Sequence, residues 1–285
     1  MGIFTHAIFD KFGIAILVLI NLSLLLLETK LPLRKVTQQK RSRIIINTVV
    51  SIPAFALLRF AFLPLMVWIA CKNQAWQFGL NYLYSSPLWA KSIIAFLLLD
   101  VGNYAWHILN HKIPFLWRFH LVHHTDLNMD ITTAFRFHFG ELIGSVFFRG
   151  TVILLSGASP ILLLVYEIIF EAATQFHHSN WKLPLLSERL LNRLIVTPRM
   201  HGIHHSVVKQ ETDSNYAVIF SFWDRLFRTG SFNHFNNEVI VGVPSYHNPD
   251  ELTIGFLLKL PFTKIRSWKK SDERNLNEIT GEKNN

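Results

Sequence analysis

The chain has 285 residues, of which 50% are hydrophobic and only 16% are charged, and its net charge is +9 with the histidines neutral. This composition is too apolar for an ordinary soluble protein and predicts a membrane protein, in which a basic excess sets the orientation and meets anionic lipid head groups. Basic and aromatic residues do not alternate as in a nucleic-acid groove. The single cysteine, Cys71, excludes both an internal disulfide and a cysteine-ligated iron–sulfur cluster.

Three apolar stretches predict membrane helices in the first part of the chain. Residues 13–28 are almost wholly apolar, and no small-residue cleavage site of a signal peptide follows them. The second stretch, 44–71, contains two prolines and an arginine and is therefore expected to be kinked. The third, 88–106, leads directly into the first histidine cluster.

Residues 142–173 are mostly apolar but carry the sequence SGASP between Ser156 and Pro160. One continuous helix would place the later histidines across the membrane from the earlier ones. A turn at Gly157–Pro160 returns both ends to the same side, and glycine with proline favours the turn. Each arm is then about 14 residues, roughly 21 Å of helix, which is short for a full span. We predict a hairpin.

The orientation follows from the distribution of basic residues. The 30–43 stretch carries six and the 72–91 stretch carries two, so residues 30–43 are predicted to be cytoplasmic. Counting spans from there places the histidine-rich segments and the C-terminus on the cytoplasmic side. The tail from about residue 264 is basic and then polar, and we expect it to lie on the membrane and then fray.

Three clusters hold eight of the 14 histidines at offsets of three or four, the spacings that place side chains on one face of a helix. Eight imidazoles exceed what one ion coordinates, so the clusters predict two metal ions. Neutral imidazole suits iron, copper, zinc and nickel. A structural zinc site needs far fewer histidines, and the Glu-x-x-His motif of soluble di-iron bundles does not occur here. The clusters are HILNH (His107, His111), HLVHH (His120, His123, His124) and HGIHH (His201, His204, His205).

Together with the residues around them, the clusters resemble the fatty acid hydroxylase / sterol desaturase superfamily of integral-membrane di-iron oxygenases. The resemblance covers roughly residues 95–230, with Phe139 at a usual proline and Arg228 at a usual glycine. The matching elements are Asp100 and Tyr104, PFLWRFHLVHHTD (Pro114 to Asp126), Arg136–His138–Glu141, FHHSN (Phe176 to Asn180), TPRMHGIHHS (Thr197 to Ser206), Asn215–Tyr216 and FWDRLFRTG (Phe222 to Gly230).

The resemblance implies that the eight clustered histidines and His178 bind two iron ions. Some relatives have a second histidine where this chain has Thr174, which cannot replace an imidazole; His177 or water are the alternatives for that place. Five residues are candidates for an extra ligand or for hydrogen bonds that orient the ligands. They are His138, His177, Asp100, Glu141 and Asn180. The isolated histidines His6, His234 and His247 are expected to be unrelated to the metals.

The implied function is a membrane-bound oxidoreductase that uses O₂ to hydroxylate or desaturate an unactivated C–H bond of a lipid. Its substrate class stays open among sterol, carotenoid, sphingolipid, fatty acid and ether lipid. The electrons must come from an external cytochrome, ferredoxin or reductase, because no dinucleotide motif or cysteine cluster occurs. The alternatives are ether-lipid cleavage at the same site, a non-enzymatic metal-binding membrane protein such as a transporter or sensor, and an inactive scaffold.

The predicted fold is all-α: an integral membrane helical bundle with a cytoplasmic, helical, histidine-rich cap that holds a dimetal site. We expect N-terminal transmembrane helices in residues 1–94 and a catalytic region in 95–235, which includes the membrane hairpin 142–173. Residues 236–285 are expected to form a C-terminal membrane-surface segment and a flexible tail.

Overall fold

The computed structural model describes residues 12–231 and 239–268, and within these ranges it is helical, with isolated bridges but no β-strand. The predicted all-α fold is confirmed. The α-helices are α2 (Ile14–Lys30), α3 (Lys40–Leu57), α4 (Leu63–Trp76), α5 (Leu88–Lys112), α6 (Pro114–His124), α7 (Phe139–Ser156), α8 (Pro160–His178), α9 (Leu185–Leu191), α10 (Pro198–His204), α11 (Lys209–Thr212), α12 (Phe222–Leu226) and α13 (Ile254–Lys259). Shorter helical turns are η2 (Leu58–Phe62), η3 (Leu80–Tyr82), η4 (Ile131–Phe135), η5 (Pro244–Tyr246), η6 (Pro249–Glu251) and η7 (Leu260–Phe262).

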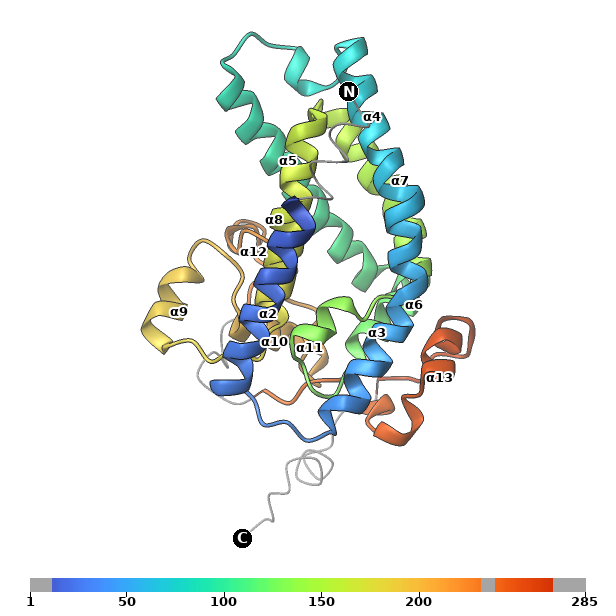
Figure 1. Ribbon diagram of the computed structural model, residues 1–285. Helices are drawn as coiled ribbons and strands as arrows, with labels where there is room; N and C mark the ends of the chain where they lie inside the picture. Colours follow the sequence, from blue (N-terminus) through green and yellow to red (C-terminus); the bar gives the residue numbers. More distant parts are fainter. Residues whose placement is uncertain (1–11, 232–238, 269–285) are drawn as a thin grey trace.

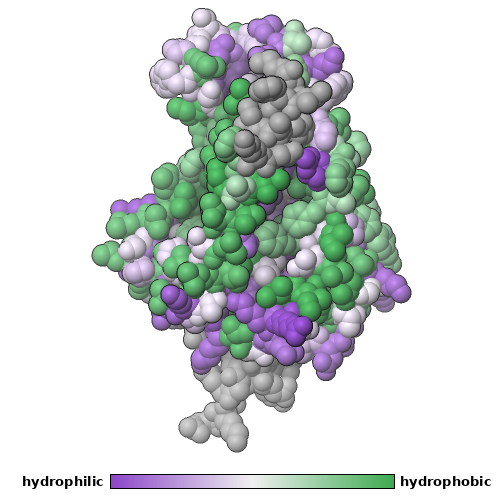
Figure 2. Space-filling model, viewed as in Figure 1, coloured by the Kyte–Doolittle hydropathy of each residue, from purple (hydrophilic) through white to green (hydrophobic). Residues whose placement is uncertain are grey.

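Three helical segments of the described chain are long and apolar enough to cross a bilayer: Lys40–Tyr82, Leu88–Lys112 and Phe139–Ser156. The second and third predicted spans and the first arm of the predicted hairpin lie within them. Helix α2 covers the first predicted span with 17 residues, about 26 Å of helix, slightly less than the hydrocarbon core of a bilayer. Apolar residues cover much of the middle of the molecule, with hydrophilic residues gathered above and below them (Figure 2).

The longest helix runs without a break from α3 through η2 into α4, for roughly 55 Å. The predicted kink takes the form of a π-helical turn, in which the amide of Leu63 donates to the carbonyl of Leu58. Pro64 follows directly; it has no N–H, and its ring crowds the carbonyl one turn earlier, so a wider turn relieves the clash. The first turns of α3 extend into the histidine cap.

The chain turns between α7 and α8, where the sequence places its glycine and proline. Gly157 adopts φ 70 after the last turn of α7, and the Ser159 side chain caps α8, which begins with Pro160. Both helices pack against α4 and α5, and α2 lies along α8 (Figure 1). A Cβ on Gly79, in the loop after α4, would lie 2.4 Å from the amide nitrogen of Gly157, so the close approach of loop and turn requires glycine.

The histidine cap consists of α6, the short helices α9 to α12 and the segment 239–268, and it lies around the lower ends of the long helices α3, α5 and α8 (Figure 1). The C-terminal segment 239–268 packs against α6 and α3 and buries Tyr246, Leu257 and Leu260 against them. Residues 269–285, the larger part of the predicted tail, lie outside the described residues. The segment 239–268 therefore encloses α6, the helix that carries the second histidine cluster.

Candidate metal centre

Nine buried or nearly buried histidines form two groups, and within each group every histidine offers a ring nitrogen within 4.8 Å of the others. These nine are the residues that the resemblance implies as iron ligands. The first group contains His107, His111, His120, His124 and His204. The second contains His123, His178, His201 and His205.

The two groups interleave along the same helices. In α6, His120 and His124 are four residues apart and share a group, whereas His123 joins the other one. In α10 and its C-cap, His201 and His205 pair in the same way, and His204 crosses to the first group. His123 and His124 are adjacent, as are His204 and His205, and adjacent side chains point about 100° apart around a helix. Each HxxHH cluster therefore contributes histidines to both groups.

Hydrogen bonds fix the tautomer of several imidazoles. Nδ1 lies 2.8 Å from the carbonyl of Tyr216 in His107, 2.7 Å from that of Ser214 in His204, and 2.8 Å from that of Thr174 in His178. A carbonyl oxygen only accepts, so Nδ1 carries the proton and Nε2 keeps its lone pair for a metal.

Four of the ring nitrogens that face inward have no hydrogen-bond partner in the described part of the chain. The Nε2 atoms of His107, His111, His204 and His205 are buried without a hydrogen bond among the described residues. An unsatisfied buried polar atom costs about 1–3 kcal/mol, so native interiors rarely contain several together. The donor set fits bound metal, which would satisfy all of these lone pairs.

The second group is tightest around His178. Its Nε2 atom lies 3.0 Å from Nε2 of His123 and 3.0 Å from Nε2 of His201. Two nitrogens at right angles on an ion, each at about 2.1 Å, would be roughly 3 Å apart. Thr174, one turn earlier, is buried and its hydroxyl oxygen has no hydrogen-bond partner. The group thus has four imidazoles, against five in the first.

Burial keeps the cap histidines neutral. It lowers the pKa of His123, His124, His201 and His205 well below the usual value, and neighbouring imidazoles lower it further. The pKa of His204 is lowered in the same way, although its hydrogen bond to Ser214 acts in the opposite direction. Neutral imidazole is the form that ligates metal.

Of the five extra candidates, Glu141 contacts a grouped histidine: its Oε1 atom accepts from Nδ1 of His120 at 3.1 Å. His177 and His138 lie outside both groups. His177 directs Nδ1 to the carbonyl of Val218, 3.2 Å away. His138 uses Nδ1 to accept from the Gly140 amide and Nε2 to donate to the carbonyl of Leu258, so neither nitrogen is free for metal.

Asp100 and Asn180, the other two candidates, hydrogen-bond to groups other than the imidazoles of the described histidines. Asp100 accepts from the indole of Trp223 at 2.7 Å, which fastens α5 to the segment around α12. Asn180 exchanges two hydrogen bonds with the backbone of Arg34 and so holds the loop between α2 and α3. Both stabilise the segments that carry the histidines. His247 lies outside both groups, and His6 and His234 lie outside the described residues.

A buried charged network behind α6 was not foreseen from the sequence. Arg43, 4% exposed, pairs with Asp126 at 2.9 Å and with Asp130 at 2.6 Å. Arg136 donates to the carbonyl of Val122 and to the amide oxygen of Asn47. This network ties the end of α6 to α3, and Arg43 is one of the six basic residues by which the sequence predicts a cytoplasmic 30–43 stretch.

The motif FWDRLFRTG, at the end of the family resemblance, fixes the backbone of Tyr216, whose carbonyl orients His107. The carboxylate of Asp224 accepts from the amides of Tyr216 and Ala217, each at 2.9 Å. Arg228, at the place of the expected glycine, has φ 58, in the left-handed region that glycine favours. The N-Y and W-D elements thus form one structural unit. A backbone acceptor of this kind leaves no direct signal in the side-chain sequence.

Comparison with known proteins agrees with this arrangement. The family model described as "Fatty acid hydroxylase" matches residues 92–229. The alkylglycerol monooxygenase of Danio rerio is 30% identical over 62% of this chain and 38% of its own length. The cholesterol 25-hydroxylase of Rattus norvegicus is 28% identical over 50% of this chain and 48% of its own. The ornithine lipid hydroxylase OlsE of Rhizobium tropici is 27% identical over 50% of this chain and 42% of its own.

These matches span less than half the length of each relative. No solved structure matches the chain. The named relatives act on three different lipids, so similarity alone leaves the substrate of this chain open.

Proposed function

The chain belongs to the fatty acid hydroxylase superfamily, and from that premise we propose that it is a membrane-bound di-iron oxygenase that hydroxylates or desaturates a lipid. The observation that carries the proposal is the pair of interleaved imidazole groups. Their neutral, unpartnered nitrogens suit two ferrous ions, because iron is among the metals that imidazole binds well. When bound, the two irons would supply the reductive activation of O₂ and the attack on an unactivated C–H bond.

The residues of the chain have three tasks in this reaction. Glu141 and the carbonyls of Tyr216 and Ser214 hold protons at Nδ1 of their histidines and so keep each Nε2 atom directed inward. Phe137 stacks on His123 at 4.9 Å between ring centres and excludes water from that side. The membrane helices hold the lipid beside the cap.

The reaction needs two electrons that the chain does not carry. Hydroxylation consumes one O₂, two electrons and two protons, and it yields the lipid alcohol and water. A one-electron carrier such as a cytochrome or ferredoxin, with its reductase, is therefore the proposed partner. Desaturation has the same requirement, with loss of a second hydrogen in place of oxygen insertion.

Ether-lipid oxidation is the second candidate, because the alkylglycerol monooxygenase of Danio rerio is among the similar proteins. Hydroxylation of the carbon beside an ether oxygen gives a hemiacetal, which separates into an aldehyde and an alcohol. The same site performs the oxidation, and only the position of the C–H bond differs.

Expression in cells that lack the gene, followed by lipid analysis under ¹⁸O₂, tests the proposal. A lipid alcohol that carries one ¹⁸O atom is the expected product, and a long-chain aldehyde identifies ether cleavage. A desaturated lipid that appears only with active protein supports the desaturase branch. Unchanged lipids with metal transport across the membrane would identify a non-enzymatic protein and overturn the proposal.

A further inference from the structure

Two adjoining cavities lead from the outer surface of the helical bundle toward the histidine groups. The inner one, about 100 Å³, lies between α3, α5, α7 and α8 and reaches Phe137 and Glu141. These two side chains contact His123 and His120 directly. The outer cavity, about 360 Å³, lies between α2, η2 and α8. The cavities share Phe55, Leu58, Phe135 and Glu171, so they meet at one junction.

The outer cavity opens toward the surface that faces lipid. Val18, Leu22 and Phe55 line it, and they are 50%, 56% and 45% exposed. Apolar residues at these exposures are ordinary in a membrane, where the solvent is the acyl chain. A lipid can therefore enter from the bilayer without crossing the polar cap.

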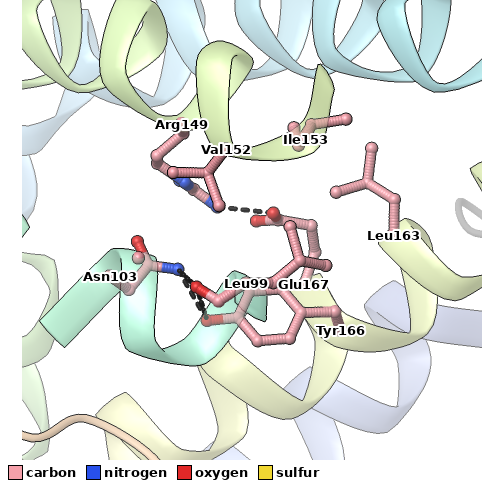
Figure 3. A pocket seen from close by; sticks show the side chains of 9 residues that line it. Leu99, Asn103, Arg149, Val152, Ile153, Leu163, Tyr166 and Glu167 are labelled. Carbon is pink, nitrogen blue, oxygen red and sulfur yellow. Dashed lines mark hydrogen bonds and ion pairs between the residues drawn. The ribbon is translucent and has the colours of Figure 1, made fainter. Parts of the chain in front are cut away.

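Polar side chains interrupt this apolar path at the junction. Glu167, Glu171 and Gln175 are spaced by four residues on one face of α8, and all three line the outer cavity. Ionisable residues that face the apolar interior of a membrane helical bundle are costly and usually functional. Arg149 reaches from α7 and forms an ion pair with Glu167 beside the labelled residues Asn103 and Tyr166 (Figure 3). The charge of Arg149 is thus already matched.

Two acceptors at or beside the junction have no donor bonded to them among the described residues. Glu171 lines both cavities, and no described residue donates a hydrogen bond to it or forms an ion pair with it at contact distance. Gln175 is 4% exposed, and its side-chain oxygen is buried without a partner. The walls of the two cavities carry three glutamates and two arginines, and Arg149 already pairs with Glu167, so the walls have no excess of positive charge. A ligand that completes this arrangement donates hydrogen bonds and brings no negative charge.

We propose that the two cavities form the lipid chamber and that Glu171 and Gln175 bind the hydroxyl group of an uncharged lipid alcohol. Arg149 lines the inner cavity near Glu171 and marks the level of the junction on α7. It lies eight residues, or two helical turns, beyond Glu141 on the same helix, which places the junction roughly 12 Å along the axis from Glu141. A hydroxyl held at the junction therefore leaves an apolar body to fill the inner cavity and reach the histidine groups. A free carboxylate or phosphate would meet the carboxylate of Glu171. That the lipid alcohol is the substrate rests on the proposed function, whereas its binding to Glu171 and Gln175 requires no metal.

Equilibrium binding to the purified, metal-free full chain in detergent tests the proposal. The probes are three radiolabelled single-chain lipids of equal length, an alcohol, a carboxylate and an amine. We expect the wild-type chain to bind the alcohol at least tenfold more tightly than the carboxylate. Glu171→Leu should weaken alcohol binding about tenfold, because it removes a hydrogen bond to a charged acceptor. Glu171→Gln keeps an acceptor without the charge and should mainly improve carboxylate binding.

Ile169→Ala is the matched control, because Ile169 lies on α8, is 39% exposed and lines neither cavity. It should leave all three affinities unchanged. Equal binding of alcohol and carboxylate by the wild type, or unchanged alcohol binding by both Glu171 variants, would overturn the proposal. Tightest binding of the amine would assign the site to an aminolipid instead. If the chain binds the alcohol as expected but oxidises no lipid, the proposed reaction is refuted and the proposed binding site is not.

Discussion

The carboxylate of Glu141 accepts a hydrogen bond from Nδ1 of His120 at 3.1 Å, and the two residues come from different helices, α7 and α6. The second carboxylate oxygen of Glu141 is buried without a partner, and the side chain also lines the inner cavity. Glu141 therefore stands between the lipid chamber and the first histidine group.

Glu141→Ala should lower iron affinity about 10- to 100-fold, because His120 loses the acceptor that fixes its tautomer. Glu141→Gln keeps an acceptor and should retain more iron than the alanine variant. Ser145→Ala is the control: it lies one turn further on the same face of α7, and its hydroxyl bonds only to the carbonyl of Leu142. Iron titration of the apo-protein measures all three. Wild-type affinity in Glu141→Ala would contradict an orienting role.

His178→Ala should cost iron and activity, whereas His177→Ala should be mild. His178 belongs to the second group and lies 3.0 Å from two of its members, while His177 points to the carbonyl of Val218. Iron content per chain is the readout, with membrane insertion as the check on folding. A larger loss in His177→Ala would mean that His177 supplies the nitrogen that Thr174 lacks.

Asp126→Asn should destabilise the cap by about 3–5 kcal/mol at neutral pH, because it removes one of the two carboxylates that pair with Arg43 and the negative charge that offsets the buried Arg136. Burial by itself would raise the pKa of Asp126, but the two arginines outweigh it and the pKa is lowered. The stabilisation is therefore present above the unfolded value of about 3.9 and is lost as pH falls through the folded value.

Thermal unfolding of both proteins in detergent, followed by circular dichroism over a pH series, measures this difference. The gap between wild type and Asp126→Asn should be constant near neutrality and shrink below about pH 4. Asp250→Asn, on a surface turn of the C-terminal segment, is the control and should change little. A gap that does not depend on pH would mean that the carboxylate charge is not what stabilises the network.

Single cysteines at two exposed positions test the topology in a Cys71→Ser background. Lys112 ends α5, and Lys182 follows α8, on either side of the α7–α8 turn. We predict that both become labelled only from the cytoplasmic side by a membrane-impermeant maleimide. Labelling of the two from opposite sides would separate His178 from His107 by the bilayer and would exclude the shared centre.

The histidine pattern carried most of the information about the site. Offsets of three and four are local, so the sequence predicts which imidazoles share a helical face before any tertiary contact is known. The assignment of His120 and His123 to different groups depends on how α5, α8 and α10 meet α6, and local spacing does not contain it. Gly157 and Pro160 similarly predicted the turn, because their backbone preferences are intrinsic.

Long-range partners were the part that sequence could not supply. Arg43 looked like one of several basic residues beside a membrane span, yet it is buried against Asp126, 83 positions later. Asp100 looked like an orienting carboxylate, and its partner is the indole of Trp223, 123 positions away. The local sequence around a charged residue near a predicted span is the same whether its side chain contacts lipid, water or a buried counter-charge. Because Arg43 is paired, fewer basic residues of the 30–43 stretch are free to set the orientation of the chain than their number in the sequence suggests.

Iron analysis of the purified chain tests the central claim most directly. Wild-type protein should hold about two iron ions per chain, one for each histidine group. His123→Ala removes a member of the second group and His204→Ala one of the first, so each should lose at least one iron while insertion into the membrane persists; His247→Ala should lose none. Full iron content and turnover in both His123→Ala and His204→Ala, or a single non-iron metal in the wild type, would contradict the di-iron assignment.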